Sequence, residues 1–213
     1  GLGTNKAVIG NNSITDVYMS RDAGATVHAA GLSIASATST NPLVEIKNTT
    51  NDVNSARLKL VKDKGAAGAA NDDAGLIQFF ADDANQDQVM FSEIKSEVKV
   101  ATNGQEGGKF TVSVAEHDGT STAGLLIEDG DANGELDVTI GAGTSSVLTV
   151  AGNAITTANL SVGGSNNELR FFEGANYVGF EAPALSADKI WVLPAADGSA
   201  NQVLKTDGSG NLD

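Results

Sequence analysis

The densest group of oxygen-donating side chains lies between two apolar stretches in the second half of the chain. Carboxylate and amide oxygens recur at every second position there, with Gly134 at the sixth position of the run. This spacing matches the start of a calcium-binding loop, because Ca²⁺ prefers several hard oxygen ligands. The sequence therefore predicts one candidate Ca²⁺ site and no other cofactor, with these ligands: Asp129, Asp131, Asn133, Glu135 and Asp137.

Two features of the same run favour a hairpin turn instead. The twelfth position is Ile140, where an EF-hand loop has a bidentate Glu, and both flanks have the alternation of strands rather than helices. Asp, Asn and Gly are also common in hairpin turns for their backbone angles. Both interpretations stay open at this point.

Signatures of nucleophilic catalysis are absent from the sequence. The chain has no Cys, which excludes disulfides and thiolate metal sites, and it has no Gly-x-Ser-x-Gly or His-Glu-x-x-His motif. His28 and His117 lie far apart in the sequence, with no nucleophile motif near either. We therefore expect no catalytic residues and a protein that is not an enzyme.

Paired carboxylates leave one enzymatic alternative, a glycan-cleaving enzyme. Such an enzyme needs two carboxyl groups roughly 5 to 9.5 Å apart across a sugar cleft. Those clefts are usually lined with aromatic residues, which make up only 5% of this chain. The residues to test first under this alternative are Arg170, Glu173, Tyr177 and Glu181.

Composition limits the partners of the chain. Its 213 residues have a net charge of −14, with 27 acidic and 13 basic residues and no basic cluster, which disfavours nucleic acid and anionic membranes. No apolar run reaches the ~18 residues of a membrane span. Ile, Leu, Val and Phe supply fewer than a quarter of the residues. This is only slightly above the ~20% typical of disordered chains, so we expect a thin core that association with other copies would complete.

Alternation of apolar and polar residues predicts many short strands separated by Gly, Asn and Asp turns. The range 88–100 also fits a helix, with Met90, Ile94 and Val98 on one face, but we favour a strand because its neighbours are strands and Val is frequent. The loop acids Asp72, Asp73, Asp82 and Asp83 are expected in solvated turns. The predicted strands cover 43–48, 56–61, 74–80, 88–100, 109–115, 123–128, 135–140, 147–152, 158–163, 169–172, 177–180 and 190–193.

The stretch Asn167–Leu212 contains the only Trp, and it reads NELRFFEGANYVGFEAPALSADKIWVLPAADGSANQVLKTDGSGNL. Its LRFFE strand, YVGFEAP corner, WVLP strand and QVLKTDGSGNL end resemble a module of bacteriophage tail fibres and related virion appendages. The segment NKAVIGNNS within residues 1–13 is similar to the Asn/Gly-rich repeat of trimeric adhesin heads. Residues 44–143 resemble a further segment of phage fibres.

These resemblances imply an all-β, elongated homotrimeric fibre of short strands, with interwound triple β-helix or β-prism segments. They imply a structural role in host attachment, a virion location that faces outward, and as partners other virion or fibre proteins and a host-surface glycan or protein. A bacterial trimeric surface adhesin is the alternative outside the phages. The expected organisation is an N-terminal coil and linker (1–41), a β-rich shaft (42–150), a stalk (151–166) and a C-terminal β-module (167–213).

Overall fold

The computed structural model describes residue 17 and residues 26–165, 167–209 and 212. The described part of the chain is all-β, as predicted, and it contains no helix. The predicted Asn/Gly-rich repeat within residues 1–13 lies outside the described residues. The chain divides into two units, Gly1–Ser146 and Val147–Asp213, and each is described by itself. In the described ranges, no helix has the length and apolar character needed to cross a membrane.

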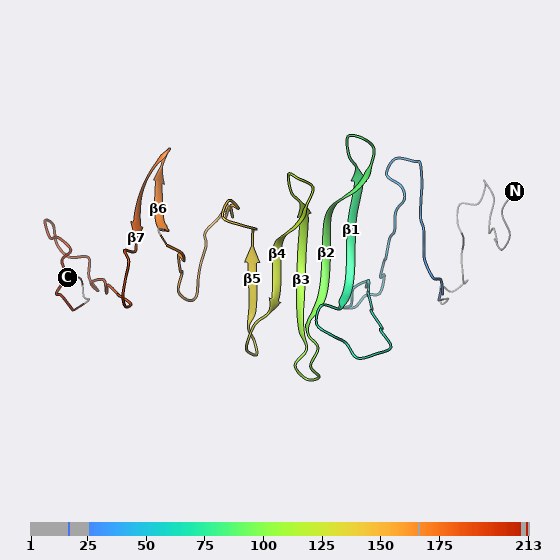
Figure 1. Ribbon diagram of the computed structural model, residues 1–213, viewed down its shortest axis with the longest axis horizontal. Coiled ribbons are helices and arrows are strands. Elements are labelled where there is room, and N and C mark those ends of the chain that lie inside the picture. Colours follow the sequence, from blue (N-terminus) through green and yellow to red (C-terminus); the bar gives the residue numbers. More distant parts are fainter. Residues whose placement is uncertain (1–16, 18–25, 166, 210–211, 213) are drawn as a thin grey trace. The chain divides into compact units, whose positions relative to one another are not determined.

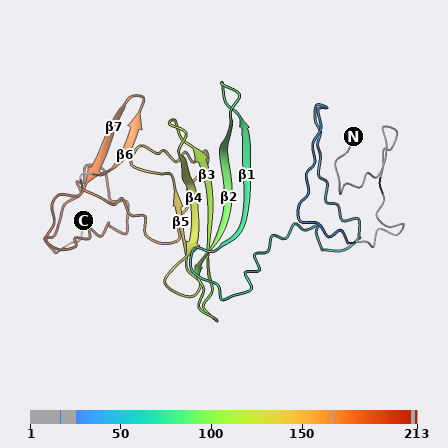
Figure 2. The same cartoon turned by 45° about the vertical axis from the view of Figure 1, so that its right-hand side comes forward.

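The first unit contains one five-stranded sheet, in which every strand runs antiparallel to its neighbours. The order in the sheet follows the order in the chain, and the strands lie side by side in both views (Figures 1 and 2). The range 88–100 is a strand, which confirms the preferred interpretation over a helix. The strands are β1 (Asp73–Asp82), β2 (Gln88–Val100), β3 (Gly107–Ala115), β4 (Ser121–Asp129) and β5 (Leu136–Ile140).

Acidic side chains end several of these strands by capping the turns. The Asp83 carboxylate accepts hydrogen bonds from the backbone N–H groups of Asn85 (2.8 Å) and Asp87 (3.0 Å) in the turn between β1 and β2. Asp118 accepts the N–H of Thr120 (2.9 Å) between β3 and β4, and this bond lowers the pKa of Asp118. Asp side chains compete with the ladder for backbone N–H groups, so they favour turns at these positions.

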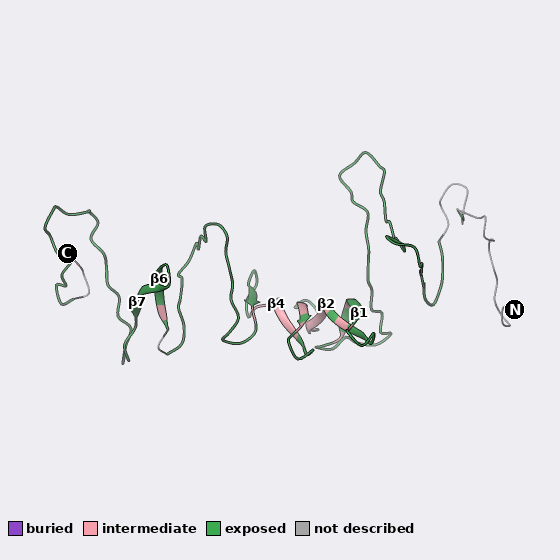
Figure 3. Cartoon of the chain, turned by 90° about the horizontal axis from the view of Figure 1, so that it is seen from above, coloured by how far each residue is buried: buried purple, intermediate pink, exposed green. Residues whose placement is uncertain are grey.

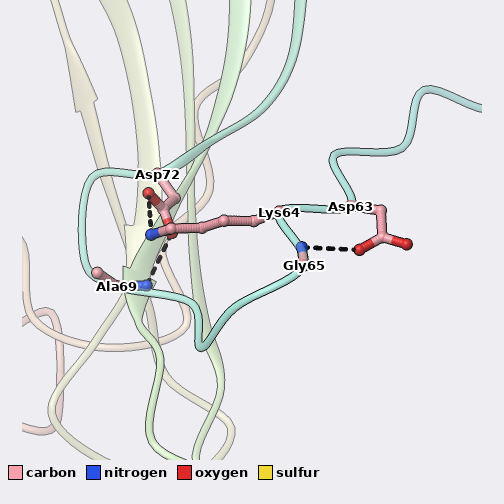
Figure 4. Close-up of polar contacts among 5 residues, drawn as sticks. All are labelled: Asp63, Lys64, Gly65, Ala69 and Asp72. Carbon is pink, nitrogen blue, oxygen red and sulfur yellow. Dashed lines mark hydrogen bonds and ion pairs between the residues drawn. The ribbon is translucent and has the colours of Figure 1, made fainter.

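The loop that leads into β1 is closed by Asp72 (Figure 4). Its two carboxylate oxygens accept hydrogen bonds from the ammonium of Lys64 at 3.0 and 2.8 Å, and Oδ2 also accepts the N–H of Ala69 at 2.8 Å. The bond from Lys64, followed by that from Ala69, lowers the pKa of Asp72. Asp72 was expected in a simple solvated turn, whereas it holds a loop together. Asp73 and Asp82 were also placed in loops, whereas they are the first and last residues of β1.

The second unit contains one hairpin, formed by β6 (Glu168–Glu173) and β7 (Asn176–Glu181). Both strands were predicted. Gly174, in the two-residue turn, has a φ of 60°, a left-handed conformation that glycine adopts without steric cost. The structure has no strand at 190–193, where one was predicted. There, the carbonyl of Val192 accepts the N–H of Leu212 at 2.9 Å.

Four more predicted strands, at 43–48, 56–61, 147–152 and 158–163, are not strands in the single chain. Alternation shows that a segment can serve as a strand, but a strand also needs a partner for its backbone groups. Between the first two segments, side chains provide the hydrogen bonds instead. The Asn48 amide donates to the carbonyl of Asn54 (3.1 Å), and its oxygen accepts the N–H of Thr50 (2.9 Å).

Within the described residues, the chain buries no hydrophobic side chain. Figure 3 shows that partial burial is concentrated in the central strands of the five-stranded sheet, whereas most of the hairpin is exposed. A sheet buries its residues mainly when a second layer packs on it, and a single layer leaves its apolar face in contact with water.

Candidate functional site: the two faces of the five-stranded sheet

One face of the five-stranded sheet is apolar. Residues directly opposite each other in neighbouring strands point to the same face, so the register assigns side chains to faces. A central row crosses all five strands and consists of Ile77, Ile94, Val112, Leu125 and Ile140. On one side of it lies the row Gly75, Ser96, Phe110, Ile127 and Val138, and on the other side lies the row Phe79, Ser92, Val114 and Thr122.

The side chains of this apolar face are substantially open to water. Phe110 in the middle of the sheet is 39% exposed, Phe79 on β1 is 49% exposed and Ile140 on β5 is 56% exposed. Soluble monomers rarely leave a continuous apolar patch of this kind uncovered. The exposure therefore makes this face the candidate functional site of the described residues.

Among the described residues, the segment before β1 covers the β1 end of this face. Leu58 and Leu60, from the segment before β1, line a hollow of about 310 Å³ together with Ile77, Ile94 and Phe110. Leu60 lies so close to Gly75 that a Cβ there would meet its Cδ1 at 3.1 Å. Glycine at position 75 therefore gives the Leu60 side chain room on the apolar face.

The opposite face carries a row of charged residues across the same five strands. The register aligns Asp73, Glu97, Lys109, Glu128 and Asp137 in one row. The Glu97 carboxylate forms ion pairs with the ammonium groups of Lys95 (N–O distance 3.1 Å) and Lys109 (3.0 Å). Its side chain is only 10% exposed.

Further ion pairs extend this network to β1 and β4. Lys95 reaches Asp73 at 3.4 Å and Lys99 reaches Glu128 at 3.4 Å. Lys99 also donates a hydrogen bond to the carbonyl of Asp129. Lysines thus pair with three of the four carboxylates of the row, those of Asp73, Glu97 and Glu128.

The charges of Glu97 and Lys95 stabilise each other. Partial burial alone would raise the pKa of Glu97, but hydrogen bonds from Lys109 and Lys95 outweigh it and hold that pKa below its usual value. The hydrogen bond to Glu97 raises the pKa of Lys95. Both groups therefore keep their charge across the neutral range.

The sequence contains a signal for this network. Glu93, Lys95, Glu97 and Lys99 occupy every second position of β2, which places them on one side of a strand. Their partners on β3 and β4 depend on register, and register shifts occur in three of the four strand pairs. The shift between Phe79 and Phe80 pairs Met90 with Phe80, so Met90 leaves the face of Ile94 on which it was expected.

The predicted calcium ligands lie in and beside the turn between β4 and β5. The Glu135 carboxylate accepts the N–H groups of Asp131 (2.9 Å) and Ala132 (3.0 Å), so it acts as a cap of the turn. Asp129 ends β4, where its carboxylate lies against Gly107, and Asp137 stands in β5 opposite Glu128. Asn133 lies in the turn between the strands.

These positions spread the five candidate ligands over a turn and two strands. Across the described ranges, no group of three or more His, Asp or Glu side chains is arranged to hold a metal ion. Both histidines, His28 and His117, are exposed.

The residues named for a glycan-cleaving enzyme lie on the hairpin. Arg170, Tyr177 and Glu181 point to one face, whereas Glu173 points to the other. The Arg170 guanidinium lies 4.5 Å from the centre of the Tyr177 ring and is paired with Glu168 at 2.6 Å. The hairpin thus brings three of the four residues together and separates Glu173 from them.

No family model, no curated protein and no solved structure matches this chain.

Proposed function

We propose that this chain is a structural segment of a trimeric phage tail fibre or similar virion appendage, which positions host-surface recognition. The observation that carries the proposal is the apolar face of the five-stranded sheet, which one chain leaves exposed. The described residues of that chain bury no hydrophobic side chain. A protein built in this way gains its core by assembly. The resemblance of Asn167–Leu212 to fibre modules supplies the phage assignment.

The proposed mechanism is mechanical. Three copies share the core that each lacks, and the charged faces and acidic turns remain in water. In this arrangement, short strands succeed one another along the fibre, in triple β-helix or β-prism segments, and their turns project outward. The segment contributes length and stiffness, and other virion or fibre proteins join its ends. Its outward location brings it near host-surface glycans and proteins.

The assembly is tested by measuring the mass of the purified chain at micromolar concentration by light scattering. We expect three copies of the 21.6-kDa chain, about 65 kDa in total. A folded monomer would contradict the fibre.

The location is tested with an antibody raised against the purified chain, by imaging labelled virions and labelled host cells side by side. Labels on the appendages of virions are expected. Labels on bacterial surfaces alone would favour a trimeric adhesin, for which the same exposed apolar face would be equally suited. Shortened chains after incubation with host polysaccharide would favour a glycan-cleaving enzyme.

A further inference from the structure

We infer that copies of this chain meet on the apolar face of the β1–β5 sheet, with the row from Ile77 to Ile140 at the centre of the interface. The inference rests on the proposed function and names the surface by which the fibre assembles. Direct pairing in four successive registers places Ile77, Ile94, Val112, Leu125 and Ile140 in line across the sheet. The result is a straight apolar stripe that runs perpendicular to the strands.

The size of the face fits a shared core. Five strands spaced about 4.8 Å apart and three rows of side chains about 7 Å apart give roughly 500 Å² of flat apolar surface. This is near the upper limit of the apolar patch that a monomer leaves exposed. It is less than the roughly 800 Å² that each partner buries in a standard pairwise interface, so this face would supply part of the contact between copies.

The distribution of charge argues for identical copies as the occupant. A chain with a net charge of −14 repels other copies of itself unless its charges avoid the contact. The three apolar rows contain no charged residue, whereas Glu97, Lys95, Lys109 and Glu128 all lie on the opposite face, where they form ion pairs. Two such acidic chains can therefore approach on the apolar face without confronting carboxylates.

The surface also has relief that a neighbouring copy can fill. The hollow of about 310 Å³ at the β1 end is lined by Leu58, Leu60, Ile77, Ile94 and Phe110, and it is open on one side. In the row that runs from Gly75 on β1 to Val138 on β5, the first two residues, Gly75 and Ser96, are small. The next two, Phe110 and Ile127, are large. A face with small residues at one end and large residues at the other can interdigitate with copies of itself.

Two adjacent leucines provide a matched test, because Leu125 belongs to the central apolar row and Leu126 points to the charged face. We expect Leu125→Asp to weaken association at least about tenfold in the full chain, measured by analytical ultracentrifugation across a concentration series. Leu126→Asp is expected to leave the trimer intact. Equal behaviour of the two variants would overturn the inference.

Cross-linking provides a second test that does not depend on a disruptive substitution. Since the chain has no native Cys, Val112→Cys introduces a single thiol on the apolar face, and Thr111→Cys introduces one on the opposite face. Mild oxidation should link two Val112→Cys chains covalently within a trimer and should leave Thr111→Cys chains unlinked. Absence of the Val112→Cys link in an intact trimer would overturn the inference.

The outcomes separate this inference from the proposed function. If the unmodified chain is a folded monomer, both fall. If it is a trimer, but Val112→Cys does not cross-link and Leu125→Asp still assembles, the proposed fibre stands and this interface is wrong. If cross-linking succeeds in a dimer, the interface stands and the trimeric fibre is wrong.

Discussion

The five-stranded sheet and the β6–β7 hairpin both contain ion pairs and aromatic side chains, but these side chains differ in how far they are exposed to water. In the sheet, the carboxylate of Glu97 bonds lysines from two strands and is 10% exposed. In the hairpin, Glu168 pairs with Arg170 of its own strand, and its carboxylate side chain is 21% exposed. The number of strands accounts for the difference, because only an interior strand has neighbours on both sides that can shield a charge from water.

The aromatic residues show the same contrast. Phe171 and Phe180 of the hairpin meet edge to face, with ring centroids 6.3 Å apart, and are 53% and 72% exposed. Phe110 in the sheet is 39% exposed because strands lie on either side of it. A two-stranded hairpin is marginal in water by itself. The strands of the sheet therefore partly bury one another's side chains, whereas the two strands of the hairpin bury few of theirs on either face.

Acid should have the largest effect, and it should act on the sheet unit first. The pKa values of five carboxyl groups in that unit are lowered, so each contributes stability above its unfolded pKa and loses it as the pH falls through its folded pKa. We expect the melting temperature followed by far-UV circular dichroism to drop between about pH 5 and pH 3. The groups are Asp52, Asp72, Glu97, Glu106 and Asp118.

The single Trp provides the comparison for this experiment. Trp191 belongs to the second unit, so its fluorescence follows that unit rather than the sheet. The melting temperature read from Trp191 should fall less over the same pH range. Equal shifts of the two signals would show that the units unfold together.

Removing the Glu97 carboxylate should be the most damaging single change among the ion pairs. We expect Glu97→Ala to lower the free energy of unfolding by about 1–2 kcal/mol, because Lys109 loses its ion-pair partner and Lys95 keeps only Asp73 in a half-buried place. The matched change in the hairpin, Glu168→Ala, should cost at most about 0.5 kcal/mol because that pair is more exposed. Urea denaturation measures both values, and a larger loss for Glu168→Ala would reverse the comparison.

Truncation of a hairpin ring measures how much shelter the hairpin has. Phe171→Ala should lower the free energy of unfolding by about 0.5–1.5 kcal/mol if the ring contacts little beyond Phe180. A loss of about 3–5 kcal/mol is typical of a ring in a packed core. A value in that range would mean that the hairpin is covered in the assembled protein. Thermal or urea unfolding followed at Trp191 gives the value.

Calcium should have the smallest effect. Because the Glu135 carboxylate already accepts two backbone N–H groups of its turn, adding Ca²⁺ at millimolar concentration should leave the melting temperature unchanged. The measurement compares the chain with and without a chelator. A rise of several degrees that Asp131→Asn abolishes would support the predicted metal site.

In the part of the chain that the structure describes, sequence alternation predicted all seven strands, β1 to β7. It worked for β2, where a helix was the competing interpretation, because the apolar and charged positions of a strand repeat every two residues. It failed at 43–48 and 56–61, because alternation is a property of one segment, whereas a strand also needs a second segment that pairs with its backbone. Leu58 and Leu60 alternate as in a strand, yet in the single chain they lie over the apolar face instead.

The two faces of the sheet could be predicted only in part. Phe110, Val112 and Val114 alternate with polar residues in the sequence, and the register places all three on one face. The rows that join strands were not predictable, because extra residues at points such as Gly124 shift the pairing beyond them. Glu97 and Lys109 face each other only because of this register, so their ion pair required the structure.

The outer strands of the sheet have a consequence for how the protein is made. β1 and β5 each have a neighbour on one side only, so their free backbone N–H and C=O groups can template pairing with any other exposed strand. β5 is short and has Asp137 at its second position, and β1 is interrupted by a register shift at Asp73 and Gly75. Such features discourage wrong pairing but do not abolish it. Aggregation therefore competes with assembly in the interval between synthesis of the chains and their association. The yield of assembled protein should rise when chains leave the ribosome close together and at low temperature.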